Sequence, residues 1–381
     1  MRPRHLALLS LALLTARLEA YPQFIGYGYT SCQVCHFNAF GNGPLTDYGR
    51  AVGASAISSK MFTSSSDEAL AEASGFLGKK KLPDWFRPAV GFRSLLLMSE
   101  IQSDQSHLRY IPMQMDASAT FISPNQNHWA SVTIGYMPAR GLNPKSEDRI
   151  PLISREHYIS TRLAENWRVM GGMMDVPYGI RIPDHTSHSR SQTQLAQNDQ
   201  SHMIALHQFG EKHEIALAAL AGNLFQEADL RQKGASLMAE YDLYEKVRIG
   251  HSHLYTKNAY RSRLMNAVHA RIGAGEGSAV LFEAGTVLQR SEIPQSTLGA
   301  YVMFENMIRA ARGLHFVVAG EVSTNDTKAG APRVFRLGPG LQWFLMNRVE
   351  WRTDLHLKRI SDAPTVEQDT VNFLTQIHLW L

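Results

Sequence analysis

The sequence predicts an all-β protein, a transmembrane antiparallel β-barrel of about 16 strands that follows a small N-terminal segment. Three observations predict this class. From residue 88 onward, segments of about ten residues alternate in polarity, which is the pattern of barrel strands that face lipid on one side and the lumen on the other. The links between these segments are alternately short and long. The chain also begins with the pattern of an export signal.

Residues 1–20 have the three parts of a cleavable secretory signal. Arg2 and Arg4 form a basic start, Leu6 to Leu14 form an apolar run, and Leu18-Glu19-Ala20 ends in a small residue. The apolar run is about half of the ~20 residues that a membrane-spanning helix needs. We therefore expect cleavage after Ala20, in preference to a retained membrane anchor.

The most specific motif follows shortly after this signal. Cys32-Gln33-Val34-Cys35-His36 has the spacing C-x-x-C-H, and the chain has 2 Cys in all, both of them in this motif. Two thiols at this spacing can bond to the two vinyl groups of one haem, and the adjacent imidazole can bind the iron. The motif predicts one covalent haem c on Cys32 and Cys35, with His36 as the metal ligand. A structural zinc site needs further Cys or His ligands at set spacings, and a thioredoxin-like pair needs a βαβ context. The sequence offers neither.

Residues 21–87 form a small unit around this motif. Aromatic residues and glycines are dense on both sides of it, as suits a backbone folded closely over a porphyrin, although an ordinary turn-rich cap would show them too. Ser65-Ser66-Asp67-Glu68 resembles a capping box, which predicts a helix that runs to about Leu77 and stops at Gly78. A unit of this size is only marginally stable alone, so we expect it to lean on the second part of the chain.

Sixteen segments make up the predicted barrel, residues 88–381. Their ranges are 88–101, 107–123, 128–139, 153–163, 167–176, 201–210, 213–223, 233–243, 247–256, 262–273, 277–290, 296–307, 313–323, 332–344, 348–359 and 369–381.

The clearest segments have one polar and one apolar face. In 263–272, Arg263, His269 and Arg271 share one face, and the other face is aliphatic apart from Asn266. Two more polar faces occur in segments 233–243 and 348–359: Ser236, Met238, Glu240 and Asp242 in the first, and Arg352, Asp354, His356 and Lys358 in the second. Because side chains alternate with period two along a strand, we expect these faces to line a polar lumen.

The links between segments carry a second, independent pattern. Every even-to-odd link is short, whereas the odd-to-even links are usually longer, above all 140–152 and 177–200. Short periplasmic turns and long external loops are typical of outer-membrane barrels. The alternative is a soluble β-sandwich, propeller or solenoid, but no repeat of 40–50 residues appears.

Composition excludes several other functions. The net charge is +4, charged residues make up 19% of the chain, and no basic run with interleaved aromatic residues suggests nucleic acid as a partner. The sequence contains no G-x-S-x-G, H-E-x-x-H or glycine-rich phosphate loop. The sequence therefore identifies no catalytic residue. The predicted class is an electron-transfer protein, and enzymatic activity is left open.

The order of these parts resembles a known family. An export signal, a single C-x-x-C-H near the mature N-terminus and a barrel resemble the fused monohaem cytochrome–porins of bacterial outer membranes, whose best-known members are iron oxidases. The local match covers Cys32 to His36 and Leu45-Thr46-Asp47-Tyr48-Gly49-Arg50, which is similar to the family's Leu-x-x-aromatic-Gly stretch. The resemblance implies a haem on Cys32 and Cys35, His36 as its proximal ligand, and electron transfer across the outer membrane.

The predicted organisation is a signal at 1–20, a monohaem cytochrome c segment at 21–87 and an outer-membrane barrel at 88–381. A single haem cannot relay electrons over a hydrocarbon core ~30 Å thick from one side only, so we expect the segment to enter and plug the lumen. The expected partners are outer-membrane lipid, a periplasmic electron carrier and an extracellular donor, with Fe(II) as the candidate. Two alternatives stay open: a porin whose haem-bearing plug gates it or senses redox state, and a periplasmic haem protein with a soluble β-domain.

The sequence does not identify the sixth iron ligand. The candidates are Met61, His207, His251, His253, His269, His315 and His356. Each of these is explained more simply as a polar group that lines the lumen. His185 and His188 lie in the longest predicted loop, where they could touch an external metal, although a solvated loop is the simpler interpretation.

Overall fold

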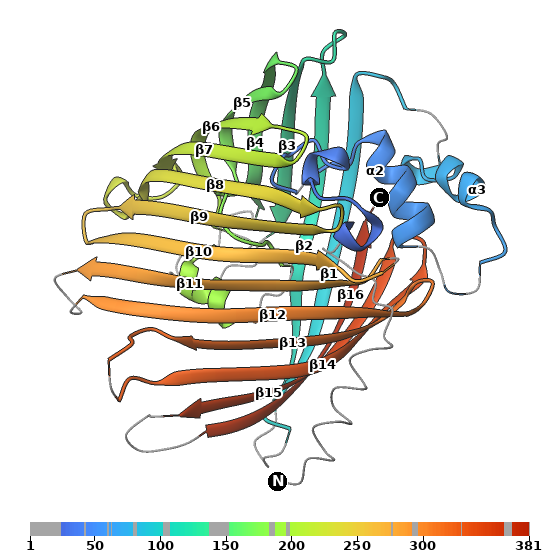
Figure 1. The fold of residues 1–381 in the computed structure, drawn as a ribbon. Helices are drawn as coiled ribbons and strands as arrows, with labels where there is room; N and C mark the ends of the chain where they lie inside the picture. The colour runs from blue at the N-terminus through green and yellow to red at the C-terminus, as the bar shows by residue number, and fades with distance from the viewer. Residues whose placement is uncertain are drawn as a thin grey trace.

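The computed structural model describes residues 24–380 except 42, 59–60, 62, 79–81, 102–106, 137–151, 183–186, 196–198, 276, 292–295, 329 and 362–367. The predicted signal at 1–20 and His185 lie outside the described residues. Within them, sixteen antiparallel strands form one closed barrel, with a group of short helices at one end (Figure 1). The expected class and strand number are confirmed.

The observed strands begin and end within a few residues of the predicted segments. Their bounds are β1 Phe86–Ser99, β2 His107–Ile122, β3 His128–Tyr136, β4 Leu152–Ala164, β5 Trp167–Met174, β6 Ser201–Phe209, β7 His213–Gly222, β8 Lys233–Tyr244, β9 Val247–Lys257, β10 Arg261–Gly273, β11 Ala279–Ser291, β12 Thr297–Ala311, β13 Leu314–Thr324, β14 Arg333–Met346, β15 Val349–Ser361 and β16 Gln368–Trp380.

Each strand pairs with its neighbours in the chain, and the first and last strands pair with each other. The register of that closing pair runs from Gly91 opposite Trp380 to Met98 opposite Phe373. Closure removes both sheet edges, so every strand finds hydrogen-bond partners on both sides, which hydrocarbon surroundings require. None of the helices in the described residues has the length and apolar character needed to cross a membrane.

The two faces of the barrel differ in polarity. Along β7, exposed and buried residues alternate throughout, with Ile215 and Leu217 exposed on the outside and Ala216 and Ala218 buried on the inside. Large apolar side chains are exposed in the same way on many other strands. An outward apolar band of this kind is what a lipid-facing barrel wall presents.

The predicted polar faces point inward where the alternation was clear. Arg263 and His269 of β10 are buried, and Leu264 and Val268 between them are exposed. The expectation for His251 and His253 of β9 was wrong.

Both of these β9 histidines are exposed on the outer face, because Ser252 and Leu254 take the inner positions. Polar residues occupy both faces of this strand, so polarity alone could not orient it.

The N-terminal part consists of short helical pieces. They are η1 Phe24–Tyr27, η2 Cys32–Val34, α2 Asp47–Val52, the π-helix η3 Gly53–Ile57, α3 Asp67–Glu72 and η4 Phe76–Gly78. Ser66 caps α3 by accepting a hydrogen bond from the amide of Ala69. This helix ends at Glu72, earlier than predicted, and Leu77 has a φ of 50°, which is incompatible with a helix that continues to Gly78.

This N-terminal part lies at the end of the barrel where the short turns are (Figure 1). Hydrogen bonds to residues of four of these turns hold it. The Gly26 carbonyl accepts hydrogen bonds from Lys246 Nζ at 2.9 Å and from the Gly277 amide at 2.8 Å. Arg312 donates to the Ser55 carbonyl at 2.7 Å, and the Arg348 amide donates to Ser58 Oγ at 3.2 Å.

From the opposite side, the long connection between β5 and β6 folds into the barrel. It carries α4, His188–Thr193, which packs against the inner faces of β12 and β13. Ser187 Oγ donates to Glu321 at 2.8 Å, and Arg190 lies 3.3 Å from Glu283. Both of these glutamates point inward, so this loop is tied to the lumen wall.

Apolar residues fill one side of the lumen between the inward loop and the N-terminal part. The cluster combines Ala39 and Phe40 of the N-terminal part with Tyr178 of the loop and with side chains of the barrel wall, among them Met265. This packing makes that side of the lumen a solid core. The N-terminal part and the barrel therefore share a hydrophobic core, as the marginal size of residues 21–87 led us to expect.

Candidate functional site

The C-x-x-C-H motif forms a single tight turn. The amides of Cys35 and His36 both donate to the carbonyl of Cys32, at 3.2 and 3.0 Å. Both cysteines are free thiols, Cys35 buried and Cys32 partly buried, and both line one cavity.

The returning chain holds this turn in place. His36 pairs with Leu45 in an isolated antiparallel bridge, and the Thr46 amide donates to the Cys35 carbonyl at 2.9 Å. Thr46 also caps α2, because its Oγ1 accepts a hydrogen bond from the Gly49 amide at 3.0 Å. The first turn of α2 thereby lies directly against Cys35. This helix was not predicted, although a threonine before an aspartate is a recognisable start signal.

A cavity opens beside the two thiols, inside the barrel. The cavity has a volume of about 130 Å³ and continues into a wider space of about 960 Å³ that includes open solvent. The N-terminal part supplies one wall, including Cys32, Cys35, His36 and Phe40. Pockets for small ligands and cofactors have volumes of about 300–1,000 Å³, so a cofactor bound here would fill the cavity and extend into the open space beside it.

The inward loop supplies the opposite wall, with residues 176–181. Two hydrogen bonds fix its backbone to the barrel: the Gly179 amide donates to Ser252 Oγ at 3.0 Å, and Ser236 Oγ donates to the Pro177 carbonyl at 2.5 Å. The Ile180 amide donates to Glu283 at 2.5 Å. The cavity is therefore enclosed between two segments that enter the barrel from opposite ends.

Charged residues of β7–β10 form the third wall. Glu214, Glu240 and Arg271 line the cavity, and Arg271 lies 2.7 Å from Glu240. Arg248 lies 3.1 Å from Glu214 and donates to the Thr30 carbonyl at 2.5 Å. In these ion pairs the charges of the arginines and glutamates neutralise each other within the lumen. The hydrogen bond from Arg248 also positions the residues that lead into the motif.

Hydroxyl groups of the residues before Cys32 complete that positioning. Thr30 Oγ1 donates to Asp242 at 3.0 Å, and Ser31 Oγ donates to Glu214 at 3.3 Å. The two residues that precede Cys32 are therefore each hydrogen-bonded to a carboxylate on the inner face of the barrel.

The electrostatic setting of the thiols is unlike that of a reactive cysteine pair. Burial, and next the neighbouring Cys32, raise the pKa of Cys35 to about 11, and burial also raises the pKa of Cys32. Redox-active and metal-binding cysteines have lowered pKa values instead. Among the described residues, no group of three or more Cys, His, Asp or Glu is arranged to hold a metal ion.

The histidines proposed as the sixth ligand lie outside this cavity. His207 is buried and stacks on Phe40, with ring centroids 5.4 Å apart, and its Nε2 is 2.9 Å from Glu214. His269 Nε2 is 2.9 Å from Glu240. Both histidines therefore contact carboxylates of the cavity wall but do not line the cavity themselves.

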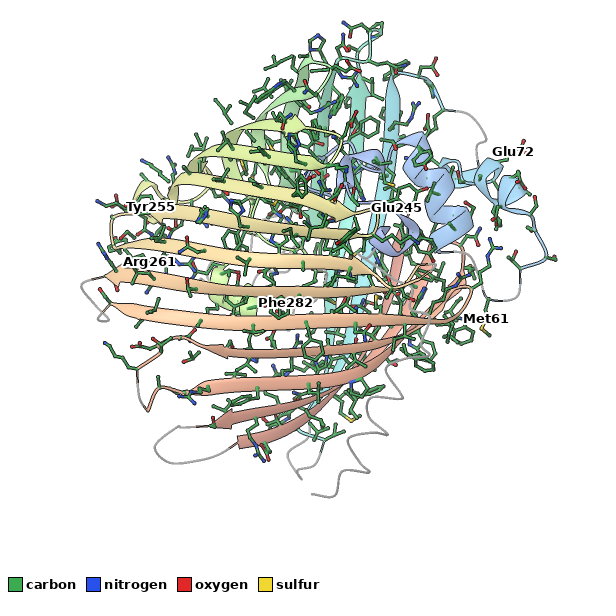
Figure 2. The ribbon with its side chains drawn as sticks, viewed as in Figure 1. Met61, Glu72, Glu245, Tyr255, Arg261 and Phe282 are labelled. Atoms are coloured by element: carbon green, nitrogen blue, oxygen red, sulfur yellow. The ribbon has the colours of Figure 1, made fainter. Side chains whose placement is uncertain are left out.

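Three other residues that were proposed as the sixth ligand do not line this cavity. His315 packs edge-on against Phe344 and His356 is buried elsewhere on the inner face. Met61 lies beyond the strand ends at the short-turn side (Figure 2). His188 begins α4, and its amide donates to Glu321.

Most residues of the cavity wall were missed by sequence reasoning, Met238 and Tyr178 among them. Met238 lines it from β8 and Tyr178 lines it from the inward loop. Met238 was placed correctly on a polar inner face, but nothing in the alternation marked it as close to the motif. Its neighbourhood is created by the docking of the N-terminal part.

Comparisons with known proteins identify the fold. No model of a protein family matches the chain, and no curated protein sequence matches it either. Among solved structures, outer-membrane expressed OmpT of Vibrio cholerae superposes with a TM-score of 0.62 and 8% identity, over 79% of this chain and 99% of that one.

Two further channels give similar values. The outer membrane channel DcaP of Acinetobacter baumannii has a TM-score of 0.59 and 9% identity over 79% of this chain and 99% of that one. OprB of Pseudomonas putida has a TM-score of 0.61 and 8% identity over 78% and 94%. At these identities the likeness concerns the fold: the barrel is porin-like.

Proposed function

We propose that this chain is an outer-membrane electron conduit in which one haem c is attached to Cys32 and Cys35 inside a porin-like barrel. The observation that carries the proposal is the cavity: both thiols and His36 line the same space within the lumen. His36 would ligate the iron. When bound, the haem supplies a single-electron carrier whose potential is tuned by its ligands and burial.

The residues of the cavity suit this group. Both cysteines of the motif line the space, and so do the apolar rings of Phe40 and Tyr178. A nonpolar, partly enclosed surrounding keeps water from the iron. Arg181 and Arg271 also line the cavity, where their guanidinium groups would meet the two carboxylates that every haem carries.

The position of the cavity matches transfer across a membrane. It lies between a loop from the long-loop end and a segment docked at the short-turn end, so a carrier held there is closer to the far surface than one bound outside either end. Val34, inside the motif, is 40% exposed, and Tyr48, next to Tyr29, is 50% exposed. These residues give a periplasmic electron carrier a surface at the short-turn end, close to the site.

The apolar outer face supports a bacterial outer-membrane location, since only a lipid-embedded or covered barrel would expose so many large apolar side chains. It weighs against a periplasmic protein with a soluble β-domain. The docked N-terminal part acts as a plug, with its contacts spread over four short turns. The electron donor outside is a reductant that reaches the long-loop end, with Fe(II) as the candidate.

A first experiment tests the haem. The full chain is produced in a host with c-type maturation machinery, and covalent haem is measured by pyridine haemochrome. We expect one haem per chain, and none in Cys32→Ala/Cys35→Ala. The variant should still show the heat-modifiable migration of a folded barrel. Colourless wild-type protein would overturn the proposal.

A second experiment tests the conduit. The holoprotein is reconstituted in liposomes that enclose a soluble cytochrome, and a membrane-impermeant reductant or Fe(II) is added outside. We expect reduction of the enclosed cytochrome, and none with the double-cysteine variant. If transfer is absent and pore conductance instead changes on reduction, the gated-porin alternative replaces the conduit.

A further inference from the structure

The cavity contains a side chain that could reach a bound iron from the barrel wall. Met238 lies on the inner face of β8, between Ser236 and Glu240. It lines the same cavity as Cys32, Cys35 and His36 but comes from a different part of the chain. A second iron ligand would have to come from outside the motif turn, and Met238 lies on a strand that the turn does not include.

The wall around Met238 is well fixed. Its cross-strand neighbours are Ala216 on β7 and Ser252 on β9. Ser252 and Ser236, on adjacent inner-face positions, both hold the inward loop through hydrogen bonds at Gly179 and Pro177. Met238 therefore lines the cavity between two hydrogen bonds that hold the inward loop. Its backbone is fixed by pairing with β7 and β9.

One side of Met238 is apolar. Its side chain packs against the core cluster that contains Ala39 and Phe40 of the N-terminal part. A thioether is a soft, neutral donor that needs no charge compensation. Such a donor can bind iron in dry surroundings where a carboxylate would need a cation.

The other potential donors of the cavity are already engaged. Glu214 and Glu240 form ion pairs with Arg248 and Arg271, at 3.1 and 2.7 Å. The Tyr29 hydroxyl is 2.6 Å from the hydroxyl of Tyr48.

Tyr178 also lines the cavity, in the inward loop. Burial raises its pKa further above the ordinary value of 10, so the phenol keeps its proton and is a poor ligand. Of the cavity-lining side chains in the described residues, Met238 is the one neutral sulfur donor outside the motif.

We infer that the thioether sulfur of Met238 is the sixth ligand of the iron whose haem is held by Cys32, Cys35 and His36; this rests on the proposed function. Methionine and histidine together raise the reduction potential of a c-type haem. The ligation also joins the N-terminal part to the barrel wall, so that the redox centre and its plug are held in the lumen by a bond as well as by packing.

The experiment uses the full-length holoprotein and its ferric absorption spectrum. Wild-type protein should show the weak near-infrared band of methionine bound to ferric haem. Met238→Leu, which conserves volume, should lose the band, bind small external ligands such as cyanide or imidazole more readily and have a lower midpoint potential. Met265→Leu is the matched control, because Met265 is buried in the same core cluster but does not line the cavity. It should keep the band.

A second variant keeps the inference testable if Met238→Leu does not fold. Met238→His should restore a six-coordinate, low-spin haem without the near-infrared band. A covalent haem whose band persists in Met238→Leu, or is missing in wild type, overturns the inference and leaves the proposed function standing. Wild-type protein without covalent haem overturns both.

Discussion

Gly49 lies so close to Cys35 that no side chain fits between them. A methyl group at residue 49 would lie 2.2 Å from the carbonyl oxygen of Cys35. The close approach lets α2 begin directly against the motif turn, where Thr46 caps the helix and bonds to the same carbonyl. The glycine of the Leu-x-x-aromatic-Gly stretch therefore has a steric role: it seats the helix that supports the motif turn.

Gly49→Ala should disturb the motif turn. Because the clash is with backbone, α2 must move away from Cys35, and we expect a large fall in the yield of covalent haem per chain. Gly53→Ala is the control, since a methyl group there meets nothing within 4 Å. Haem content by pyridine haemochrome, normalised to folded barrel, decides the comparison. Equal haem content in the two variants would contradict this role.

Arg348→Ala should loosen the N-terminal part at the short-turn end. The guanidinium of Arg348 is buried and donates to the Ser74 carbonyl. Its loss leaves that acceptor without this donor, which costs about 1–3 kcal/mol. We expect a higher single-channel conductance in planar bilayers and faster proteolysis of the N-terminal part.

Arg359→Ala serves as the control for this substitution. Arg359 forms an exposed ion pair with Asp369 at 2.6 Å, and pairs exposed to solvent in this way contribute little to stability. Conductance should stay at the wild-type level. An unchanged conductance in Arg348→Ala as well would mean that this contact does not hold the plug.

The thiol of Cys35 should react slowly in haem-free protein. With its pKa raised to about 11, its thiolate fraction at pH 8 is roughly 200-fold below that of a free cysteine with a pKa of about 8.5. Alkylation followed by mass spectrometry should therefore accelerate as the pH rises toward 11, while urea-unfolded chain reacts quickly already near pH 8.5.

The same shift makes the stability of the haem-free N-terminal part depend on pH. A raised pKa favours the protonated thiol in the folded state, so this contribution is fully present below the ordinary cysteine pKa. It is lost as the pH rises through about 11. Fast alkylation at pH 8 in the folded protein would show that Cys35 is not buried as described.

Glu283→Ala should release the inward loop. Glu283 is fully buried and accepts hydrogen bonds from the Ile180 amide and from the Tyr301 hydroxyl, and it lies 3.3 Å from Arg190. Breaking a buried pair of this kind costs about 3–5 kcal/mol. We expect faster amide hydrogen exchange in residues 176–182 and a lower temperature for the heat-modifiable shift.

Glu245→Ala is a suitable control for that substitution. Glu245 is exposed in the turn between β8 and β9, at the opposite end of the barrel from Tyr255 (Figure 2). Surface substitutions of this kind stay within about 0.5 kcal/mol. Unchanged exchange at 176–182 in Glu283→Ala would show that the other tethers suffice.

The outer position of His251 and His253 leads to a further test. Leucine at either position places an apolar side chain against lipid, so we expect equal or greater barrel stability in detergent. His269→Leu removes an inner-face partner of Glu240 and should cost about 1–3 kcal/mol. The temperature of the heat-modifiable shift compares all three. A stabilising effect of His269→Leu alone would reverse the assignment of faces.

Much of the barrel was readable from sequence. Strand number, strand bounds and the asymmetry of turns and loops follow from local features, because a lipid-facing wall forces period-two alternation along every strand. Polarity did not predict which face of β9 points inward. Ser252 and His253 are both polar, and only the structure shows that Ser252 is buried and His253 is exposed. Sequence reasoning also missed α2, whose short apolar pattern gave no helical period.

The sequence by itself determined a C-x-x-C-H motif ahead of a barrel of sixteen strands, since thiol spacing and strand alternation are local properties of the chain. Only the tertiary structure decided what meets the motif: Met238 from β8, Tyr178 from the inward loop and Arg271 from β10. These residues are brought together by docking of the N-terminal part and folding of a long loop into the lumen. Contacts between segments so distant in the chain depend on packing, and no local pattern of residues encodes them.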